Sequence, residues 1–98
     1  MEQLTLLYPE ATRPMTGRAH IGIVGSGDLE VLLEPNSQSG ASVKIQTTVD
    51  GHSDVWKRVL DRFFAHYDGA IAIEINDCGA TPGVVALRLE QAVERSRQ

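Results

Sequence analysis

The segment with the clearest capacity for chemistry is Gly25-Ser26-Gly27-Asp28, in which one serine stands between two glycines. Glycine accepts a positive φ and places no side chain over its neighbour, so this pattern presents the serine at the tip of a turn. A hydroxyl is a weak nucleophile without a base beside it, and no His or Lys is placed in the sequence to activate this one. Two interpretations follow: a serine that a separate enzyme modifies, or an ordinary hairpin turn.

Two better-known motifs that contain glycine or serine do not fit this loop. A dinucleotide fingerprint needs a third glycine and a helix, whereas Gly25-x-Gly27 runs into Leu29 and a strand-like pattern. The nucleophile elbow of serine hydrolases needs glycine two residues after the serine, and this chain has Asp28 there. Asp28 orients the loop, assists a metal-dependent transferase, or simply forms part of the turn; the sequence leaves these open.

A second punctuated segment, from Asn76 to Gly83, joins a predicted strand to a predicted helix. Thr81 followed by Pro82 is typical of a helix start, and a helix start attracts phosphate through its free N–H groups. Asp77 is expected to close the turn by accepting backbone N–H groups. The segment is therefore an anion-friendly site or an ordinary capped helix.

The remaining chain alternates between strand-like and helix-like periods. Apolar residues at every second position predict strands over Gln3–Tyr8, Ala19–Val24, Leu29–Leu33, Val43–Val49 and Ile71–Ile75, with a hairpin loop at Gly25–Asp28 and a polar loop at Pro35–Ala41.

Two segments have helical spacing. Ser53 is expected to cap a helix that continues to Tyr67, with Gly69 as the stop signal. Thr81 is expected to cap a second helix that runs towards Arg95. The inward positions of this second helix are Val85, Leu89, Ala92 and Val93. Trp56, Phe63 and Phe64 are predicted to lie in the core or at the edge of a partner surface.

These elements predict an α+β fold in the order β-β-β-β-α-β-α, a mostly antiparallel sheet with two helices packed on one face, and a single domain over residues 1–98. The net charge of −4 argues against a dedicated nucleic-acid binder. No apolar run approaches the roughly 20 residues that span a bilayer. Cys78 is the only cysteine, so no internal disulfide forms and a cytosolic protein is expected.

Other candidate residues carry weaker signals. His20, His52 and His66 lack ligand-like spacing, so no metal site is expected. Arg13 and Arg18 precede the second strand; they reach a phosphate or are ordinary surface charges. Cys78 is expected to be a small, partly buried residue rather than a nucleophile.

The two motifs together resemble a known family. The segment from Ile21 to Leu32, Ile-Gly-Ile-Val-Gly-Ser-Gly-Asp-Leu-Glu-Val-Leu, resembles the modification loop of the malonate decarboxylase acyl carrier protein (delta subunit) family. The segment from Asn76 to Val84 is similar to that family's second signature. The residues between them, Thr47–Asp50, Trp56 and Asp61-Arg62, also fall at family-like positions, so the likeness covers essentially the whole chain.

The resemblance implies a non-catalytic carrier. In that family the serine of the Gly-Ser-Gly-Asp loop bears 2′-(5″-phosphoribosyl)-3′-dephospho-coenzyme A through a phosphodiester, which assigns this role to Ser26, with Gly25, Gly27 and Asp28 as its loop. A holo-carrier synthase attaches the group. An acyl transferase subunit exchanges acetyl for malonyl on its thiol, and decarboxylase subunits then release CO2, so that malonate becomes acetate.

Three alternatives remain beside this interpretation. A citrate lyase-type carrier uses the same kind of arm. An unmodified α+β domain with a regulatory or ligand-binding role is a second alternative. A stand-alone enzyme is a third, and it is disfavoured because no base, metal cluster or nucleophile pair is visible in the sequence.

Overall fold

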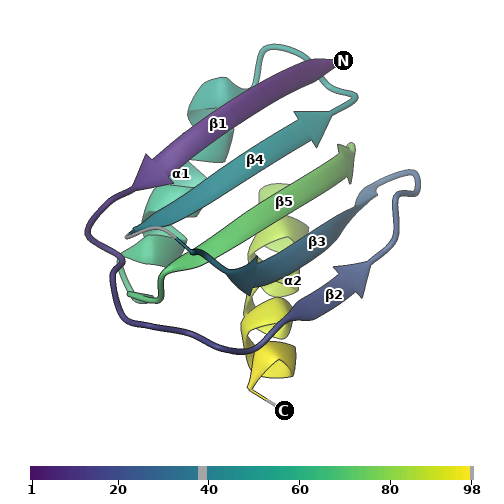
Figure 1. Cartoon of the computed structure of the whole chain (residues 1–98). Helices are drawn as coiled ribbons and strands as arrows, with labels where there is room; N and C mark the ends of the chain where they lie inside the picture. Colours follow the sequence, from purple (N-terminus) through teal and green to yellow (C-terminus); the bar gives the residue numbers. More distant parts are fainter. Residues whose placement is uncertain (38–39, 98) are drawn as a thin grey trace.

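A single mixed sheet forms one layer of the molecule in the computed structural model, which describes residues 1–37 and 40–97 (Figure 1). Its strands lie side by side in the order β1-β4-β5-β3-β2. Their bounds are β1 Glu2–Tyr8, β2 Ala19–Gly22, β3 Asp28–Pro35, β4 Ala41–Thr47 and β5 Ile71–Cys78.

Two helices, α1 (Ser53–Phe64) and α2 (Pro82–Ser96), form the second layer on one face of this sheet (Figure 1). The predicted α+β class, the element order β-β-β-β-α-β-α and the placement of both helices on one face are confirmed. The sheet is mostly antiparallel, as predicted. Its one parallel pair is β4 with β5, and α1 makes the crossover that a parallel pair requires.

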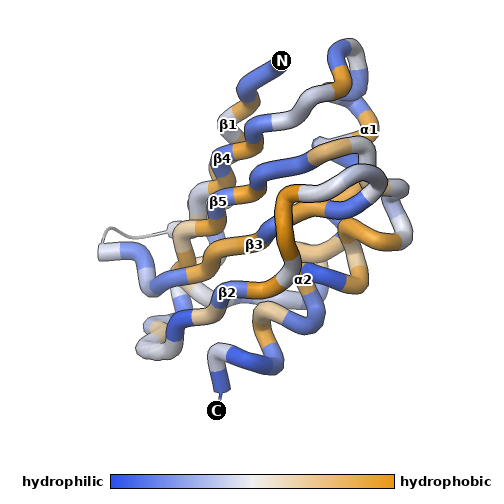
Figure 2. Tube along the Cα trace, turned by 90° about the vertical axis from the view of Figure 1, so that its right-hand side faces the viewer, coloured by the Kyte–Doolittle hydropathy of each residue, from blue (hydrophilic) through white to orange (hydrophobic). Residues whose placement is uncertain are grey.

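Alternation along the strands separates a buried face from an exposed one. In β5, Ile71, Ile73 and Ile75 are buried while Glu74 is exposed. The hydropathy along the trace alternates in the same way in Figure 2. Because helices cover only one face of the sheet, apolar and polar residues must alternate along each strand. This alternation is the pattern from which the strands were predicted.

The inner faces of the helices complete the core. All four residues predicted to point inward from α2 are buried: Val85, Leu89, Ala92 and Val93. From α1 the core receives Trp56, Leu60 and Phe63. Trp56 and Phe63 are therefore core residues in this chain, while Phe64 is half-buried and stacks on Tyr8 with ring centroids 4.1 Å apart.

The predicted bounds of the first helix were wrong at both ends. Ser53 is the first helical residue, and the N-cap position belongs to His52, which makes no side-chain capping bond. The helix ends at Phe64 and not at Tyr67. After the helix, the N–H of Ala70 donates to the carbonyl of Arg13 at 2.8 Å. The chain therefore leaves the direction of the helix to pair with the segment around Arg13.

Several strands also differ from the predicted spans. β2 ends at Gly22 instead of Val24, because Gly22 has a φ of 81° and its backbone lies against the carbonyl of Leu29. β4 occupies Ala41–Thr47, two residues earlier than predicted, and β5 continues to Cys78. The predicted polar loop Pro35–Ala41 is shorter than expected, since its first and last residues belong to strands, and residues 38 and 39 lie outside the described part of the chain.

The two leucines on α2 at positions 87 and 89 make a matched test of this packing. Leu89 is fully buried, whereas Leu87 is 54% exposed on the same helix. Leu89→Ala should lower the free energy of unfolding by about 2–5 kcal/mol, because it leaves a cavity in the core. Leu87→Ala should change it by no more than about 0.5 kcal/mol. Urea unfolding of both variants measures the difference, and equal losses would contradict the packing described.

Candidate functional site

Ser26 lies at the exposed tip of the connection between β2 and β3. The N–H of Asp28 donates to the carbonyl of Gly25 at 2.9 Å, which closes a four-residue β-turn around the serine. Gly27 has a φ of 75°, the left-handed value that the third residue of a type II turn needs. The glycine after the serine is therefore a conformational requirement of the turn.

The same turn is fastened to the neighbouring strand. The N–H of Gly27 donates to the carbonyl of Cys78 at 2.7 Å, and the antiparallel register places Asp28 opposite Cys78 and Leu29 opposite Asp77. The two segments singled out in the sequence, some 50 residues apart, thus lie side by side at one end of the sheet. The sequence alone did not predict that they meet.

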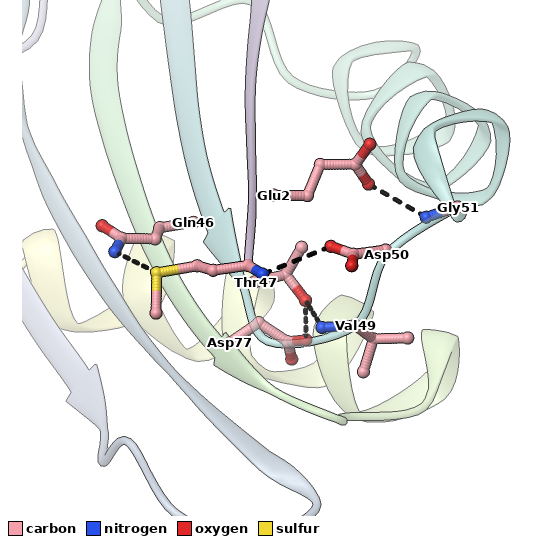
Figure 3. A network of polar contacts seen from close by, with 8 residues as sticks. Glu2, Gln46, Thr47, Val49, Asp50, Gly51 and Asp77 are labelled. Atoms are coloured by element: carbon pink, nitrogen blue, oxygen red, sulfur yellow. Dashed lines mark hydrogen bonds and ion pairs between the residues drawn. The ribbon is translucent and has the colours of Figure 1, made fainter.

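Asp77 organises the second segment from inside the protein. It is only 4% exposed, and its carboxylate accepts the N–H groups of Gly79 at 3.1 Å and Ala80 at 3.0 Å. The hydroxyl of Thr47 donates to the same carboxylate at 2.8 Å (Figure 3). The predicted role of Asp77 in closing this turn is confirmed.

The end of β4 joins this network. The Thr47 hydroxyl also accepts the N–H of Val49 at 3.1 Å, so one buried side chain ties the loop that leads to α1 to the turn that follows β5. Figure 3 shows this loop bound on its outer side to the first strand, where Glu2 accepts the N–H of Gly51 at 3.2 Å. These hydrogen bonds connect the loop after β4 to the turn after β5, which lies next to the serine turn.

The start of α2 has the predicted cap. The Thr81 side chain accepts the N–H of Val84 at 3.3 Å, and Pro82 occupies the first helical turn. The sequence signal was specific here, because threonine satisfies a free N–H group and proline has none to satisfy.

Asp28 makes the most specific side-chain interaction of the serine loop, with Arg88 of α2. The Nε of Arg88 donates to Oδ1 at 3.2 Å and its Nη2 donates to Oδ2 at 2.8 Å, which is the paired geometry that arginine forms with carboxylates. The N–H of Leu29 donates to Oδ1 at 2.7 Å. Of the interpretations left open for Asp28, the one in which it orients the loop agrees with this geometry.

Sequence reasoning missed Arg88. It stands between the inward-facing Val85 and Leu89, so the helical period places it at the border of the buried face. An arginine at such a border is a candidate for an ion pair with a carboxylate, and this was the available signal. The partner could not be chosen without the sheet register.

The other predicted candidates lie away from the serine. Arg18 pairs with Glu34 at 2.9 Å, and Arg13 pairs with Asp68 and lies over the Tyr67 ring. His20 lies 2.8 Å from a Glu30 oxygen. Within the described residues, no group of three His, Cys, Asp or Glu side chains could hold a metal ion.

Ser26 is exposed, and few atoms lie near the two glycines beside it. A Cβ on Gly27 would lie within 4 Å of no atom outside the neighbouring residues, and one on Gly25 would meet only the Ile23 side chain. Ile23 and Val24, just before the turn, are 70% and 57% exposed. Across the described part of the chain, no side chain forms a hydrogen bond with the Ser26 hydroxyl.

The fold and this site, an exposed serine on a hydrogen-bonded hairpin turn, can be compared with those of known proteins. The sequence model of the family described as "Malonate decarboxylase delta subunit (MdcD)" matches residues 16–96. The chain belongs to this family.

Individual relatives agree over nearly the full length. The chain is 52% identical over 98 residues to a malonate decarboxylase acyl carrier protein of Pseudomonas savastanoi, covering 96% of this chain and 95% of the relative. It is 47% identical over 95 residues to the protein of the same name from Azotobacter vinelandii, with the same coverage.

A solved structure has the same fold. A chain in the crystal structure of a Pseudomonas malonate decarboxylase hetero-tetramer in complex with malonate superposes with a TM-score of 0.90 and 49% sequence identity. The match covers 96% of this chain and 97% of that chain. The predicted family is confirmed, and its members are named as carriers, in agreement with the predicted non-catalytic subunit. Neither of the two helices in residues 1–37 and 40–97 has the length and hydropathy of a membrane span.

The ion pair makes a prediction for the titration of Asp28. The hydrogen bonds from Arg88, followed by that from the Leu29 N–H, hold the pKa of this carboxyl below its usual value, which is about 3.9. The stabilising contribution of the pair is therefore complete above that value and is lost as the pH falls through the lower, folded-state pKa.

Carbon-13 NMR of the Asp28 carboxyl should give a midpoint below the usual value in the wild type. Arg88→Gln should move it upward, because the main cause of the shift is removed. Arg18→Gln removes an arginine that pairs elsewhere and should leave it unchanged. A midpoint that stays low in Arg88→Gln would show that Arg88 is not the cause.

Proposed function

We propose that residues 1–98 form one acyl carrier domain, the acyl carrier subunit of a malonate decarboxylase. In this proposal Ser26 carries 2′-(5″-phosphoribosyl)-3′-dephospho-coenzyme A through a phosphodiester. The observation that carries the proposal is the exposed Ser26 on a turn fixed at its base, in a chain that belongs to the delta subunit family.

The residues present fit this group. Ser26 is exposed, and a Cβ on the adjoining Gly27 would lie within 4 Å of no atom outside the neighbouring residues. The backbone bond from Gly27 to Cys78 would hold the attachment point beside β5. When bound, the group supplies a terminal thiol for the acyl thioester, which takes up the charge that develops as CO2 leaves.

The absence of a base bonded to Ser26, within the described residues, suits this division of labour. The hydroxyl must lose its proton when the phosphodiester forms, and the modifying enzyme supplies the base for that step. Afterwards the serine oxygen only holds the arm. The protein's own contribution is to present the serine and to keep the acyl group near its partners, because a flexible tether gives effective concentrations on the order of millimolar.

The proposal names partners by the chemistry they perform. An acyl transferase subunit exchanges acetyl for malonyl, decarboxylase subunits release CO2 from the malonyl thioester, and a holo-carrier synthase attaches the arm. The hetero-tetramer named for the similar Pseudomonas structure supports assembly with other subunits. The family match favours this assignment over a citrate lyase-type carrier. The cytosolic location stays a prediction.

Intact mass tests the attachment. The chain is produced in a host that also expresses the cognate modifying enzymes, and it should carry one adduct larger than phosphopantetheine. Ser26→Ala should abolish the adduct because the acceptor oxygen is gone. Ser37→Ala removes another exposed serine and should leave it intact.

An adduct that persists in Ser26→Ala would contradict the proposal. With the holo form in hand, acyl exchange driven by citrate and not by malonate would favour the alternative carrier family.

A further inference from the structure

We propose that Arg88 is the positioning residue of the modification loop: through Asp28 it fixes the turn that presents Ser26 to the modifying transferase. The inference deepens the proposed function and rests on it for the transfer step. The positioning itself can be measured on the unmodified protein.

The guanidinium of Arg88 is held at both of its edges. Its Nε and Nη2 face the two oxygens of Asp28, while its Nη1 donates to the side-chain oxygen of Gln91, one turn further along α2, at 3.0 Å. The residue after it, Leu89, is fully buried and anchors the helix in the core. Arg88 therefore connects the loop to a helix whose position is fixed by the core.

The pair is also shielded from solvent more than the other arginine pairs. The Arg88 and Asp28 side chains are 28% and 26% exposed, compared with 74% and 56% for Arg18 and Glu34. Screening by water weakens an exposed pair more than a shielded one. The ion pair between Arg88 and Asp28 is therefore expected to hold its residues in place more strongly than the exposed pair between Arg18 and Glu34.

Gly22, at the end of β2, lies close to the strand that carries Asp28. A Cβ on Gly22 would lie 2.2 Å from the carbonyl oxygen of Leu29, so any side chain there would displace the backbone of β3 next to Asp28. The same Cβ would lie 3.6 Å from Nε of Arg88, which is ordinary van der Waals contact. Gly22 therefore preserves the close approach of β2 to the backbone beside Asp28.

The connection from Asp28 to the serine is short. The carboxylate of Asp28 holds Arg88, and its own N–H closes the turn onto Gly25. Fixing this one residue fixes the end of the turn two positions from Ser26. In the transfer, the serine oxygen forms a bond to the donor phosphorus, the bond from that phosphorus to the activating phosphate of the donor breaks, and the hydroxyl proton passes to a base of the transferase. The oxygen must meet the phosphorus in line with this leaving group, and small misplacements of a reacting atom lower rates strongly.

This geometry predicts how the variants behave in transfer assays with the cognate synthase and its activated coenzyme A-derived donor. Arg88→Ala should lower kcat for modification of Ser26 by about tenfold or more, with KM for the carrier nearly unchanged, because the loop is misplaced and the docking surface is kept. Arg88→Lys should recover only part of the rate, since an ammonium cannot make both bonds.

A double-mutant cycle separates positioning from direct participation. If Arg88 acts through Asp28, then Asp28→Ala, Arg88→Ala and the double variant should lose rate to a similar extent. Arg18→Ala removes an ion pair at the opposite end of the β2–β3 hairpin and should keep the wild-type rate. A normal rate in Arg88→Ala, or a loss in Arg88→Ala with a normal rate in Asp28→Ala, overturns the inference.

Hydrogen exchange on the unmodified chain keeps the two proposals distinguishable. The amides of Gly27 and Asp28, which donate to the carbonyls of Cys78 and Gly25, should exchange about tenfold faster in Arg88→Ala, while amides of β4 keep their protection, because only the turn is loosened. Unchanged exchange at Gly27 and Asp28 contradicts the positioning role. A wild-type chain that is never modified, yet shows this exchange response, contradicts only the proposed function.

Discussion

The antiparallel pairing of β3 with β5 is the constraint on which the rest of this structure depends. It runs from Pro35 opposite Ile71 to Asp28 opposite Cys78, and it ends in the bond from the Gly27 N–H to the Cys78 carbonyl. A shift of one residue would turn the buried isoleucines of β5 towards solvent. The burial of the core therefore fixes the register, and the register brings the serine turn to the turn organised by Asp77.

Hydrogen bonds hold the serine turn from two sides of this pairing. On one side the buried Thr47–Asp77 bond braces the turn after β5. On the other side Arg88 fastens the end of the serine turn to α2. Neither set of bonds includes the side chain of Ser26, which is exposed. In the proposed function, Ser26 is the point of attachment, and the movement needed to visit successive active sites belongs to the arm.

Local patterns in the sequence predicted the ends of elements well where a single residue satisfies or removes a nearby backbone N–H group. Thr81 and Pro82 marked the start of α2, and Asp77 marked its turn, because each satisfies or removes a backbone N–H group close by. The first helix was placed less well. Its start lacks a side-chain cap, and its end is set by bonds to Arg13, a residue distant in the sequence.

What the sequence could not supply was the set of long-range partners. The spacing of Arg88 showed a position at the border of the buried face, but Asp28 is 60 residues away and meets it only after β3 pairs with β5. The parallel pairing of β4 with β5 was hidden for the same reason. The arm proposed for Ser26 rests on the family resemblance alone, since a serine between glycines is common turn chemistry.

The central claim is that this register presents Ser26 as the attachment point of the arm. Trypsin should release one peptide from Ala19 to Lys44, which contains Ser26 together with the serines at positions 37, 39 and 42. Fragmentation of that peptide from the carrier isolated within its assembled complex locates the modification directly. The account predicts an adduct with the mass of the phosphoribosyl-dephospho-coenzyme A group, lodged on Ser26 alone. An adduct on any other serine, with Ser26 unmodified, would contradict it.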